Sequence, residues 1–276
     1  MSEPPHVARV LRGPLRGVRS TETLSGQHFG RHWHDAYGFG ILEAGAQRSA
    51  SGRGRVDAFA GQVITTNPGE VHDGAPLGSA TRQWRILSVD VDVFSAITEQ
   101  VGAAGEIMLP VIDDPILYDA LRRLFRRLES WKARSGNGTT EALACEESLV
   151  EAAAQLMARH GTARVRTDAP SPDLRQLRDR LADELFDPPS LADMAAMTGL
   201  SRYQVLRRFE KTYGLPPHAW LLSRRAEYAL RLIRRGETLA EAAMASGFSD
   251  QSHMTRVFVR HHGFTPGAWR KAAALQ

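Results

Sequence analysis

The 276-residue sequence contains one cysteine, Cys145, and no apolar run long enough to cross a membrane. A single cysteine excludes an internal disulfide and a cysteine-rich zinc site, and its apolar helical context predicts a buried side chain. A transmembrane helix needs about 20 consecutive apolar residues, so we expect no membrane association. The N-terminus contains Glu3 and two prolines and does not resemble a signal peptide, which predicts a cytoplasmic protein.

Sequence motifs of two large enzyme classes are also absent. The chain has no nucleophile elbow and no phosphate-binding loop of the form GxxxxGK followed by Ser or Thr. We therefore expect neither acyl transfer nor phosphate-loop chemistry, no enzymatic activity and no cofactor. Hydrophobic residues make up 42% and charged residues 24% of the chain, which is typical of a soluble globular protein. Its length suffices for two domains with separate cores.

Positive charge is concentrated in the last third of the chain. The net charge is +4, whereas the segment from Asp173 onward has sixteen Lys and Arg against eleven Asp and Glu, a difference of +5. The remainder is therefore close to neutral. A basic C-terminal segment permits a polyanionic partner such as DNA.

One pattern occurs twice between about Ser190 and Trp269. The copies read SLADMAAMTGLSRYQVLRRFEKTYGLPP and TLAEAAMASGFSDQSHMTRVFVRHHGFTP. Each copy opens with a capping box, in which Ser190 or Thr238 precedes an acid by three residues. Each then predicts a short apolar helix. Two copies with the same internal spacing rarely arise by chance.

The middle of each copy predicts a tight turn between two helices. Gly199 or Gly247 supplies the positive φ that this turn requires. Ser201 and Ser249 are then expected to cap the second helix of each pair. A long helix from about His218 to Arg235 joins the copies. The pattern is that of two helix-turn-helix units.

The stretch from Pro172 to Arg270 resembles the DNA-binding domain of the AraC/XylS family of bacterial transcription regulators. The matching features are the two helix-turn-helix units, the turn Gly247-Phe248-Ser249, the run Gln251-Ser252-His253, and Pro217 and Pro266 after each unit. The resemblance implies promoter DNA as partner, with the second helix of each unit in a major groove. If the connecting helix holds these helices ~34 Å apart, they meet adjacent major grooves.

Side chains that suit base edges and phosphates occur on and beside both second helices. Arginine can read guanine and glutamine can read adenine in the major groove. The base-reading candidates are Arg202, Tyr203, Gln204, Arg207, Arg208, Asp250, Gln251, Ser252, His253 and Arg256. The candidates for phosphate contacts are Lys211, Arg224 and Arg225. Any one of these arginines could equally be a solvated surface charge.

The N-terminal half predicts strands between about Phe29 and Val93. Short β-type runs such as Tyr37–Leu42 alternate with glycine-rich turns, which favours a sandwich or a barrel. We expect the alternating residues Tyr37, Phe39 and Ile41 to point inside the barrel.

Two histidine-bearing stretches, Arg31–Asp35 and Asn67–His72, resemble the cupin-type sensor domain of AraC-family regulators across residues 27–93. Gly38 stands where metal-binding cupins usually carry a glutamate, and Glu70 offers a carboxylate at a different spacing. Three interpretations stay open: a metal held by three histidines, strand-end histidines that bind the backbone, and polar groups that orient a small effector. The metal alternative uses His32, His34 and His72. The effector-pocket candidates are His32, His34, Tyr37, Glu43, His72, Trp84 and Arg85.

Helical periodicity follows the strands. Apolar residues at positions 117, 121, 124 and 128 predict one helix, and a second is expected over residues 141–159 with Leu143, Leu149, Ala153 and Leu156 inward. In the family such helices often form a dimer contact, but they could equally cover the barrel. We expect a cupin-like domain over residues 1–160, a linker over 161–172 and a DNA-binding domain over 173–276.

The sequence thus predicts an α+β chain of two domains: a cupin-like barrel with flanking helices, then an all-α double helix-turn-helix. The resemblance implies a sequence-specific transcription regulator whose effector, bound in the barrel, controls DNA binding and RNA polymerase recruitment, with a possible homodimer. Two alternatives remain. One is a cupin metalloenzyme with a DNA-binding tail, and the other is a constitutive DNA binder whose sensor binds no ligand.

Overall fold

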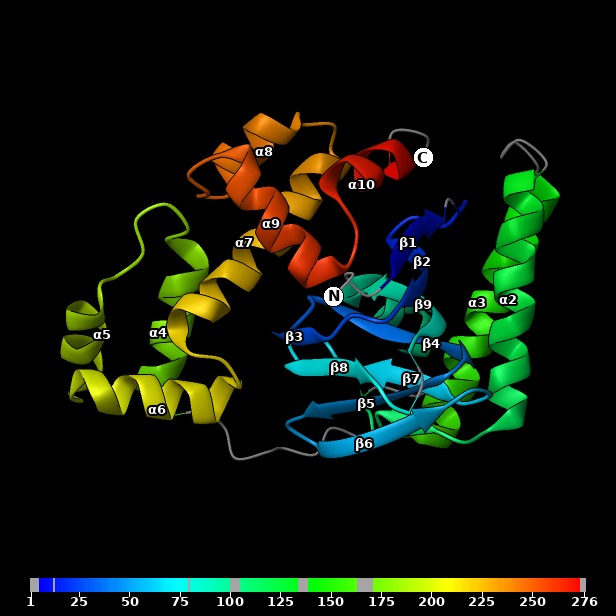
Figure 1. Ribbon diagram of the computed structural model, residues 1–276, viewed down its shortest axis with the longest axis horizontal. Helices are drawn as coiled ribbons and strands as arrows, with labels where there is room; N and C mark the ends of the chain where they lie inside the picture. Colours follow the sequence, from blue (N-terminus) through cyan, green and yellow to red (C-terminus); the bar gives the residue numbers. More distant parts are fainter. Residues whose placement is uncertain are drawn as a thin grey trace. The chain divides into compact units, whose positions relative to one another are not determined.

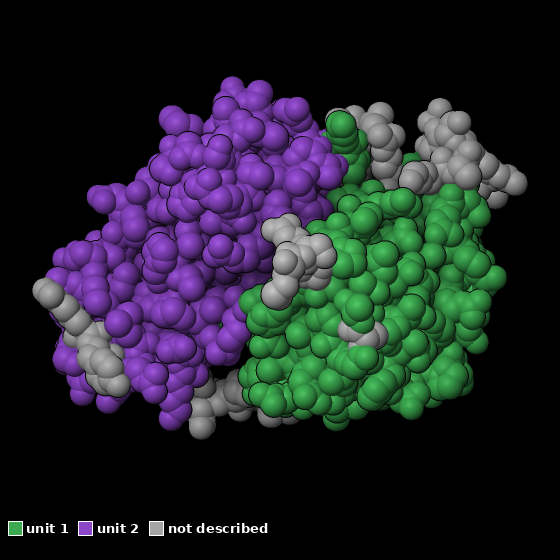
Figure 2. All heavy atoms as spheres, in the orientation of Figure 1, with its two compact units in different colours: residues 1–30, 34–165, 271–276 green, residues 31–33, 166–270 purple. Residues whose placement is uncertain are grey.

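The chain divides into two compact units, which Figure 2 draws in different colours. The computed structural model describes residues 5–11, 13–78, 80–99, 105–133, 139–162 and 171–273. Unit 1 comprises residues 1–30, 34–165 and 271–276, and unit 2 comprises residues 31–33 and 166–270. Most of the predicted linker, residues 163–170, lies outside the described part. Among the described helices, none combines the length and apolar character needed to cross a bilayer.

Unit 1 is built on two main β-sheets (Figure 1). The six-stranded antiparallel sheet has the order β1 (His6–Leu11), β2 (Val18–Ser25), β9 (Arg82–Asp90), β4 (Ala36–Ala44), β7 (Val63–Thr66) and β11 (Val111–Ile112). The four-stranded sheet has the order β3 (Phe29–His32), β8 (His72–Pro76), β5 (Ala46–Ser51) and β6 (Gly54–Phe59). A small third sheet pairs β10 (Glu106–Ile107) with β12 (Gly161–Thr162). Strands β1 and β2 precede the region in which the sequence predicts strands.

Three helices cover one face of the six-stranded sheet. They are α1 (Val91–Glu99), α2 (Pro115–Ala133) and α3 (Thr139–His160). The leucines of α2 at positions 117, 121, 124 and 128 are buried, as their spacing predicts. They join Leu87 and Val89 of β9 in one apolar core. This core lies between the sheet and the helices, so the sheet has one face toward helices and one toward the second sheet.

The structure corrects two predictions about which side chains point inward. Tyr37, Phe39 and Ile41 do share one face of β4, but they pack in the core beneath the helices and not between the two sheets. Leu143 on α3 is 54% exposed, whereas Cys145 is fully buried in the same helix. The first correction follows from the helical layer, because a strand alternation identifies one face without saying what covers it. In α3 the buried face contains Cys145, Leu149, Ala153 and Leu156, and Leu143 lies off that face.

Asp114 joins the start of α2 to the end of α3. Its side chain is 3% exposed and accepts hydrogen bonds from the backbone N–H groups of Ile116 and Leu117 at 3.0 and 3.2 Å. It also accepts a hydrogen bond from His160 Nε2 at 2.8 Å and forms an ion pair with Arg159 Nε at 3.0 Å. Burial raises the pKa of Asp114, but these hydrogen bonds and the arginine charge together hold it below the usual aspartate value.

This lowered pKa predicts that Asp114 stabilises unit 1 at neutral pH and less so in acid. The stabilisation is complete above the pKa of the unfolded chain and is lost as the pH falls through the lower pKa of the folded chain. Asp114→Asn should lower the free energy of unfolding of unit 1 by about 2 kcal/mol at neutral pH, because the ionic hydrogen bonds are lost. Thermal unfolding monitored by circular dichroism should show a weaker loss of stability toward acid for this variant than for the unsubstituted chain. An unchanged pH dependence would contradict the assigned role.

Apart from residues 31–33, unit 2 consists of helices arranged around one long helix, and the last helix ends in residues grouped with unit 1. The helices are α4 (Pro172–Asp183), α5 (Leu191–Thr198), α6 (Arg202–Tyr213), α7 (Pro217–Arg234), α8 (Leu239–Ala245), α9 (Gln251–His262) and α10 (Pro266–Ala273). Helix α7 packs against α4 and α6 on one side and α8 and α9 on the other (Figure 1). Its apolar residues Trp220, Leu221, Ala226, Leu230 and Ile233 are buried, as predicted. One helix therefore connects the two predicted helix-turn-helix units.

The capping residues form as the sequence predicts, with one exception. Ser190, Ser201 and Thr238 each cap their helix in a reciprocal capping box. The N-cap of α9 is Asp250 and not the predicted Ser249, because the second copy carries one extra residue at this point. The Asp250 carboxylate accepts the His253 N–H at 2.7 Å. The repeat therefore gives both recognition helices a defined first turn.

Candidate DNA-binding interface and sensor site

Helix α6 separates a polar exposed face from a buried one. Val205 and Phe209 are fully buried. The exposed candidates on this helix are Gln204, Arg207, Arg208 and Lys211. The side chains of Arg202 and Tyr203 lie outside the described part of the structure. The described side chains are therefore placed on one solvent-facing side, where a ligand as large as DNA can reach them.

Two of these exposed residues have partners on α6 itself. Gln204 Oε1 accepts the Ser201 N–H at 3.0 Å, so its amide oxygen completes the capping box. Arg207 lies 3.9 Å from Glu210, and the Arg207 side chain is 67% exposed. An exposed ion pair at this distance is weak. Arg207 can therefore exchange this carboxylate for a base edge or a phosphate.

Helix α9 presents a less basic surface. Asp250, Gln251, Ser252 and Arg256 are exposed, and Met254 and Phe258 are fully buried. The hydrogen bond from the His253 N–H, followed by that from Ser249, lowers the pKa of Asp250. Asp250 is therefore ionised at neutral pH, and its negative charge repels a phosphate backbone.

His253 is held against the turn that precedes α9. Its Nδ1 lies 3.2 Å from Ser249 Oγ, and its ring meets the Phe248 ring edge-on with centroids 5.3 Å apart. The side chain is half-buried. This predicted base reader is thus oriented by its own helix-turn-helix before any DNA is bound.

Arg225, a predicted phosphate contact, has an internal role in the structure. Its Nε and one terminal amino group donate to Leu185 O at 3.0 and 2.6 Å. Leu185 follows α4, and Gly247 sits so close to the same carbonyl that a Cβ there would lie 2.3 Å from it. Arg225 therefore ties the segment before α5 to α7, and the turn between α8 and α9 packs closely against this contact. Arg224, the neighbour of Arg225 on α7, is half-buried.

The predicted effector-pocket residues fall on both faces of the six-stranded sheet. Trp84 packs with Leu42 and Ala58 between the two sheets. Tyr37 instead stacks on Phe94 of α1 at 4.1 Å and donates to Gly105 O. Arg85 lies over Phe125 of α2.

Glu43 accompanies Arg85 on the helix side. Arg85 Nε lies 3.2 Å from Glu43, and Arg85 donates to Glu129 of α2 at 2.6 Å. The structure therefore does not bring Tyr37, Glu43 and Arg85 together with Trp84. Neighbouring residues on a strand point to opposite faces, which separates Trp84 from Arg85.

His34 and His72 lie together in unit 1, with ring centroids 5.5 Å apart. Burial lowers the pKa of both rings, and the neighbouring His72 further lowers that of His34. His72 Nδ1 also lies 2.9 Å from Glu70 O. His32 belongs to the short segment grouped with unit 2, so the three-histidine metal site stays a prediction. A Cβ on Gly38 would lie 2.3 Å from Thr66 Oγ1, so a glutamate there would require the Thr66 side chain to move.

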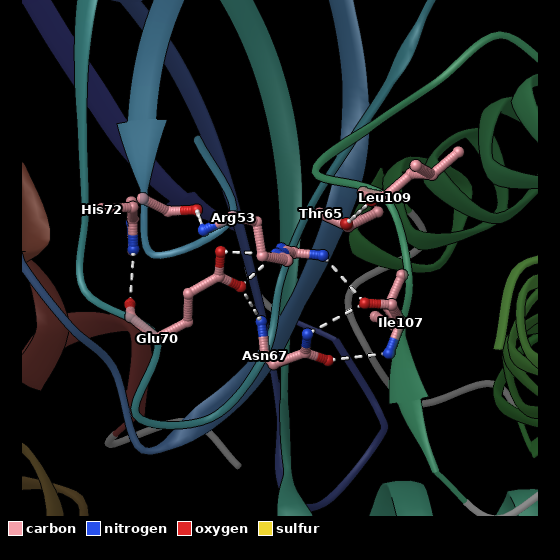
Figure 3. Close-up of polar contacts among 8 residues, drawn as sticks. Arg53, Thr65, Asn67, Glu70, His72, Ile107 and Leu109 are labelled. Atoms are coloured by element: carbon pink, nitrogen blue, oxygen red, sulfur yellow. Dashed lines mark hydrogen bonds and ion pairs between the residues drawn. The ribbon is translucent and has the colours of Figure 1, made fainter. Parts of the chain in front are cut away.

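Glu70 takes part in a polar network that sequence reasoning did not identify (Figure 3). Arg53 donates to both Glu70 carboxylate oxygens, at 2.8 and 2.5 Å, and to Ile107 O at 2.8 Å. Asn67 donates to Ile107 O at 3.0 Å and accepts its N–H at 2.9 Å. The network joins the β5–β6 hairpin to β10, and it leaves Glu70 paired with a guanidinium.

Arg82 is a second missed residue, buried between the sheets with 1% exposure. Its guanidinium donates to Gln47 Oε1 and to the carbonyl oxygens of Gln27 and Gly74 at 3.0–3.2 Å. It also lies over the Trp84 ring at 4.8 Å. Burial lowers its pKa to about 10, so it remains charged at neutral pH. Only the long-range strand pairing could have revealed this position.

Comparison with known proteins agrees with this two-part organisation. A model of AraC-like ligand-binding domains matches residues 17–153, and a helix-turn-helix domain model matches residues 194–272. An uncharacterised helix-turn-helix-type transcriptional regulator, YbfI of Bacillus subtilis (strain 168), is 26% identical over 83% of this chain and 82% of its own length. The transcriptional regulator MtrA of Neisseria gonorrhoeae is 32% identical over 36% of this chain and 33% of its own.

Solved structures show the same fold across the whole chain. ToxT from Vibrio cholerae aligns over 97% of this chain and 97% of its own, with a TM-score of 0.53 and 12% identity. Wild-type ToxT bound to an unsaturated fatty acid aligns over 98% and 97% of the two chains, with a TM-score of 0.54 and 12% identity. The two family models match both halves of the chain, and the chain belongs to the AraC family of DNA-binding transcription regulators.

Proposed function

We propose that this regulator reads two DNA half-sites with α6 and α9 and changes its binding when a small molecule occupies unit 1. The observation that carries the proposal is the pair of capped helix-turn-helix units on one connecting helix, α7. Helix α6 presents an arginine-rich face and α9 a polar one. Lys211 suits phosphate contacts, which position the protein without reading sequence.

Selection of bound duplexes from a random pool tests the DNA part directly. With the full-length protein at near-physiological salt, we expect two short motifs about one helical turn apart. Binding without any motif that disappears as salt rises would indicate a generic polyanion surface and contradict the proposal.

Three substitutions on α6 should separate base reading from phosphate contact. Arg207→Ala or Arg208→Ala should weaken the free energy of DNA binding by ~1–3 kcal/mol and relax the base preference at one position. Lys211→Ala should weaken binding to all DNA sequences alike and reduce the salt slope of binding by about one. Binding titrations on selected and scrambled duplexes at several salt concentrations check both. Equal weakening of every sequence by all three changes would show that α6 reads no bases.

The regulatory part of the proposal concerns unit 1. We propose that an effector binds in unit 1, with Trp84 between the two sheets and the pair His34 and His72 as candidate contacts, and that a cytoplasmic homodimer forms through α2. The unsaturated fatty acid bound to ToxT is a ligand of that protein, but it supports a small-molecule role for this fold. An effector acts only if it binds one arrangement of the protein better than another. Promoter occupancy would then recruit RNA polymerase.

Thermal stabilisation across a panel of metabolites tests the sensor. A ligand that raises the unfolding temperature of the full-length protein supports the proposal. If no metabolite raises the unfolding temperature, the result favours a constitutive DNA binder. Metal analysis of the purified protein, repeated on His34→Ala, tests the metalloenzyme alternative. Relatives of this chain are transcription regulators, so we propose no enzymatic activity.

A further inference from the structure

A shallow pocket of about 460 Å³, wide open to solvent, lies in unit 2 beside the start of α9. Phe186 from the segment after α4, Met244 of α8 and Phe248 of the second turn provide its apolar walls. Arg225, Gly247, Ser249 and His253 complete the lining. The volume lies within the range of small-molecule sites. Neither the sequence nor the relation to AraC-family regulators assigns a role to this position.

The apolar walls are unusually exposed. Phe186 is 69% and Met244 66% exposed, more than any other large hydrophobic side chain in the described part of the chain. Phe248, in contrast, is 4% exposed and anchors the turn in the core. Two large apolar groups that face solvent on either side of a hollow leave apolar area that a bound ligand can cover.

A single positive charge lies in the same pocket. Arg225 uses its Nε and one terminal amino group on Leu185 O, and no acceptor for the other amino group occurs among the described residues. The side chain is half-buried. A guanidinium in this position favours a carboxylate, because a charge-assisted hydrogen bond is roughly twice as strong as a neutral one.

The rim of the pocket belongs to the second recognition helix. Ser249 and His253 contact each other across the first turn of α9, and the His253 ring packs on Phe248. A ligand in the pocket would therefore touch a side chain that we propose to face DNA. Its negative charge would also lie close to the phosphates of a bound duplex and weaken binding.

We propose that this pocket binds a small amphipathic carboxylate, with its apolar part between Phe186 and Met244 and its carboxylate on Arg225, and that occupancy lowers affinity for DNA. The site is separate from the effector site proposed in unit 1. It would give the DNA-binding unit its own ligand response.

The test uses full-length protein with ¹³C-labelled methionine methyl groups and two probes, 4-phenylbutyrate and the neutral 4-phenylbutanamide. We expect a saturable shift of the Met244 methyl signal with the carboxylate and no shift of Met108, an exposed methionine of unit 1. The amide should bind at least about tenfold more weakly. Phe186→Ala should weaken binding of the carboxylate probe by a similar factor. Substitution of Phe59, an exposed phenylalanine of unit 1, by alanine should leave this binding unchanged.

Two variants test the charge. Arg225→Gln should abolish the preference for carboxylate over amide. Phe186→Glu tests the charge at an exposed position and leaves the Arg225 hydrogen bonds in place. Compared with Phe186→Ala, which also lacks the apolar wall, it should weaken binding of the carboxylate further and leave binding of the amide unchanged. An unmoved Met244 signal would overturn the site, and equal affinities for the two probes would overturn its anion preference. These readouts need no DNA, so they stand or fall independently of the proposed operator binding.

Discussion

Replacing Gly247 with alanine should destabilise unit 2 by about 3 kcal/mol, because the new methyl group meets both a strained backbone and a rigid neighbour. Gly247 has φ +78°, which L-residues rarely adopt. A Cβ there would lie 2.3 Å from Leu185 O and 3.0 Å from Arg225 Nε. The carbonyl is backbone and accepts two hydrogen bonds from Arg225, so it cannot move away without loss of these bonds.

The equivalent glycine of the first unit is a matched control. Gly199 has φ +63°, and a Cβ there meets no described atom within 4 Å. Gly199→Ala should therefore cost only the conformational strain, about 1 kcal/mol. Urea unfolding of the full-length variants, followed by far-ultraviolet circular dichroism, measures both. Equal losses at the two positions would mean that the approach to Leu185 has no energetic consequence.

Arg53→Ala should destabilise unit 1 by about 3 kcal/mol, since it leaves Glu70 with a largely buried charge. The Arg53 and Glu70 side chains are 24% and 11% exposed. Without the guanidinium, the Asn67 N–H at 3.0 Å is the remaining described donor to the Glu70 carboxylate. Ile107 O also loses one of its two side-chain hydrogen bonds, so the attachment of β10 weakens.

The same sheet offers an exposed pair of similar geometry. Arg48 donates to both Asp57 oxygens at 2.7 Å, but these side chains are 47% and 32% exposed. Arg48→Ala should therefore change stability far less than Arg53→Ala, because water replaces the lost partner. The double variant Arg53→Ala with Glu70→Ala should regain part of the loss caused by Arg53→Ala alone. Thermal unfolding of the unsubstituted chain, Arg53→Ala, Glu70→Ala and the double variant distinguishes this from simple additivity, which would argue against the buried pair.

The sensor shows where sequence reasoning falls short. The alternation in β4 correctly predicts a strand, but only the position of α1 and α2 makes Tyr37 face helices. Arg85 and Trp84 are neighbours in sequence and line opposite faces of the sheet, since successive side chains of a strand alternate. Glu70 could be noticed as a carboxylate near His72, yet its partner Arg53 comes from another hairpin, and no local pattern connects them.

The DNA-binding half can be recognised from the order of its residues alone. The capping boxes, the glycine turns and the apolar face of α7 depend on residues three or four positions apart, so the pattern is visible along the chain. The contacts of Gly247 with Leu185, the pairing of Arg53 with Glu70 and the pocket beside Phe186 and Met244 have no such local signal. They join segments 17 to 62 positions apart, and only the packing of whole elements brings such segments together.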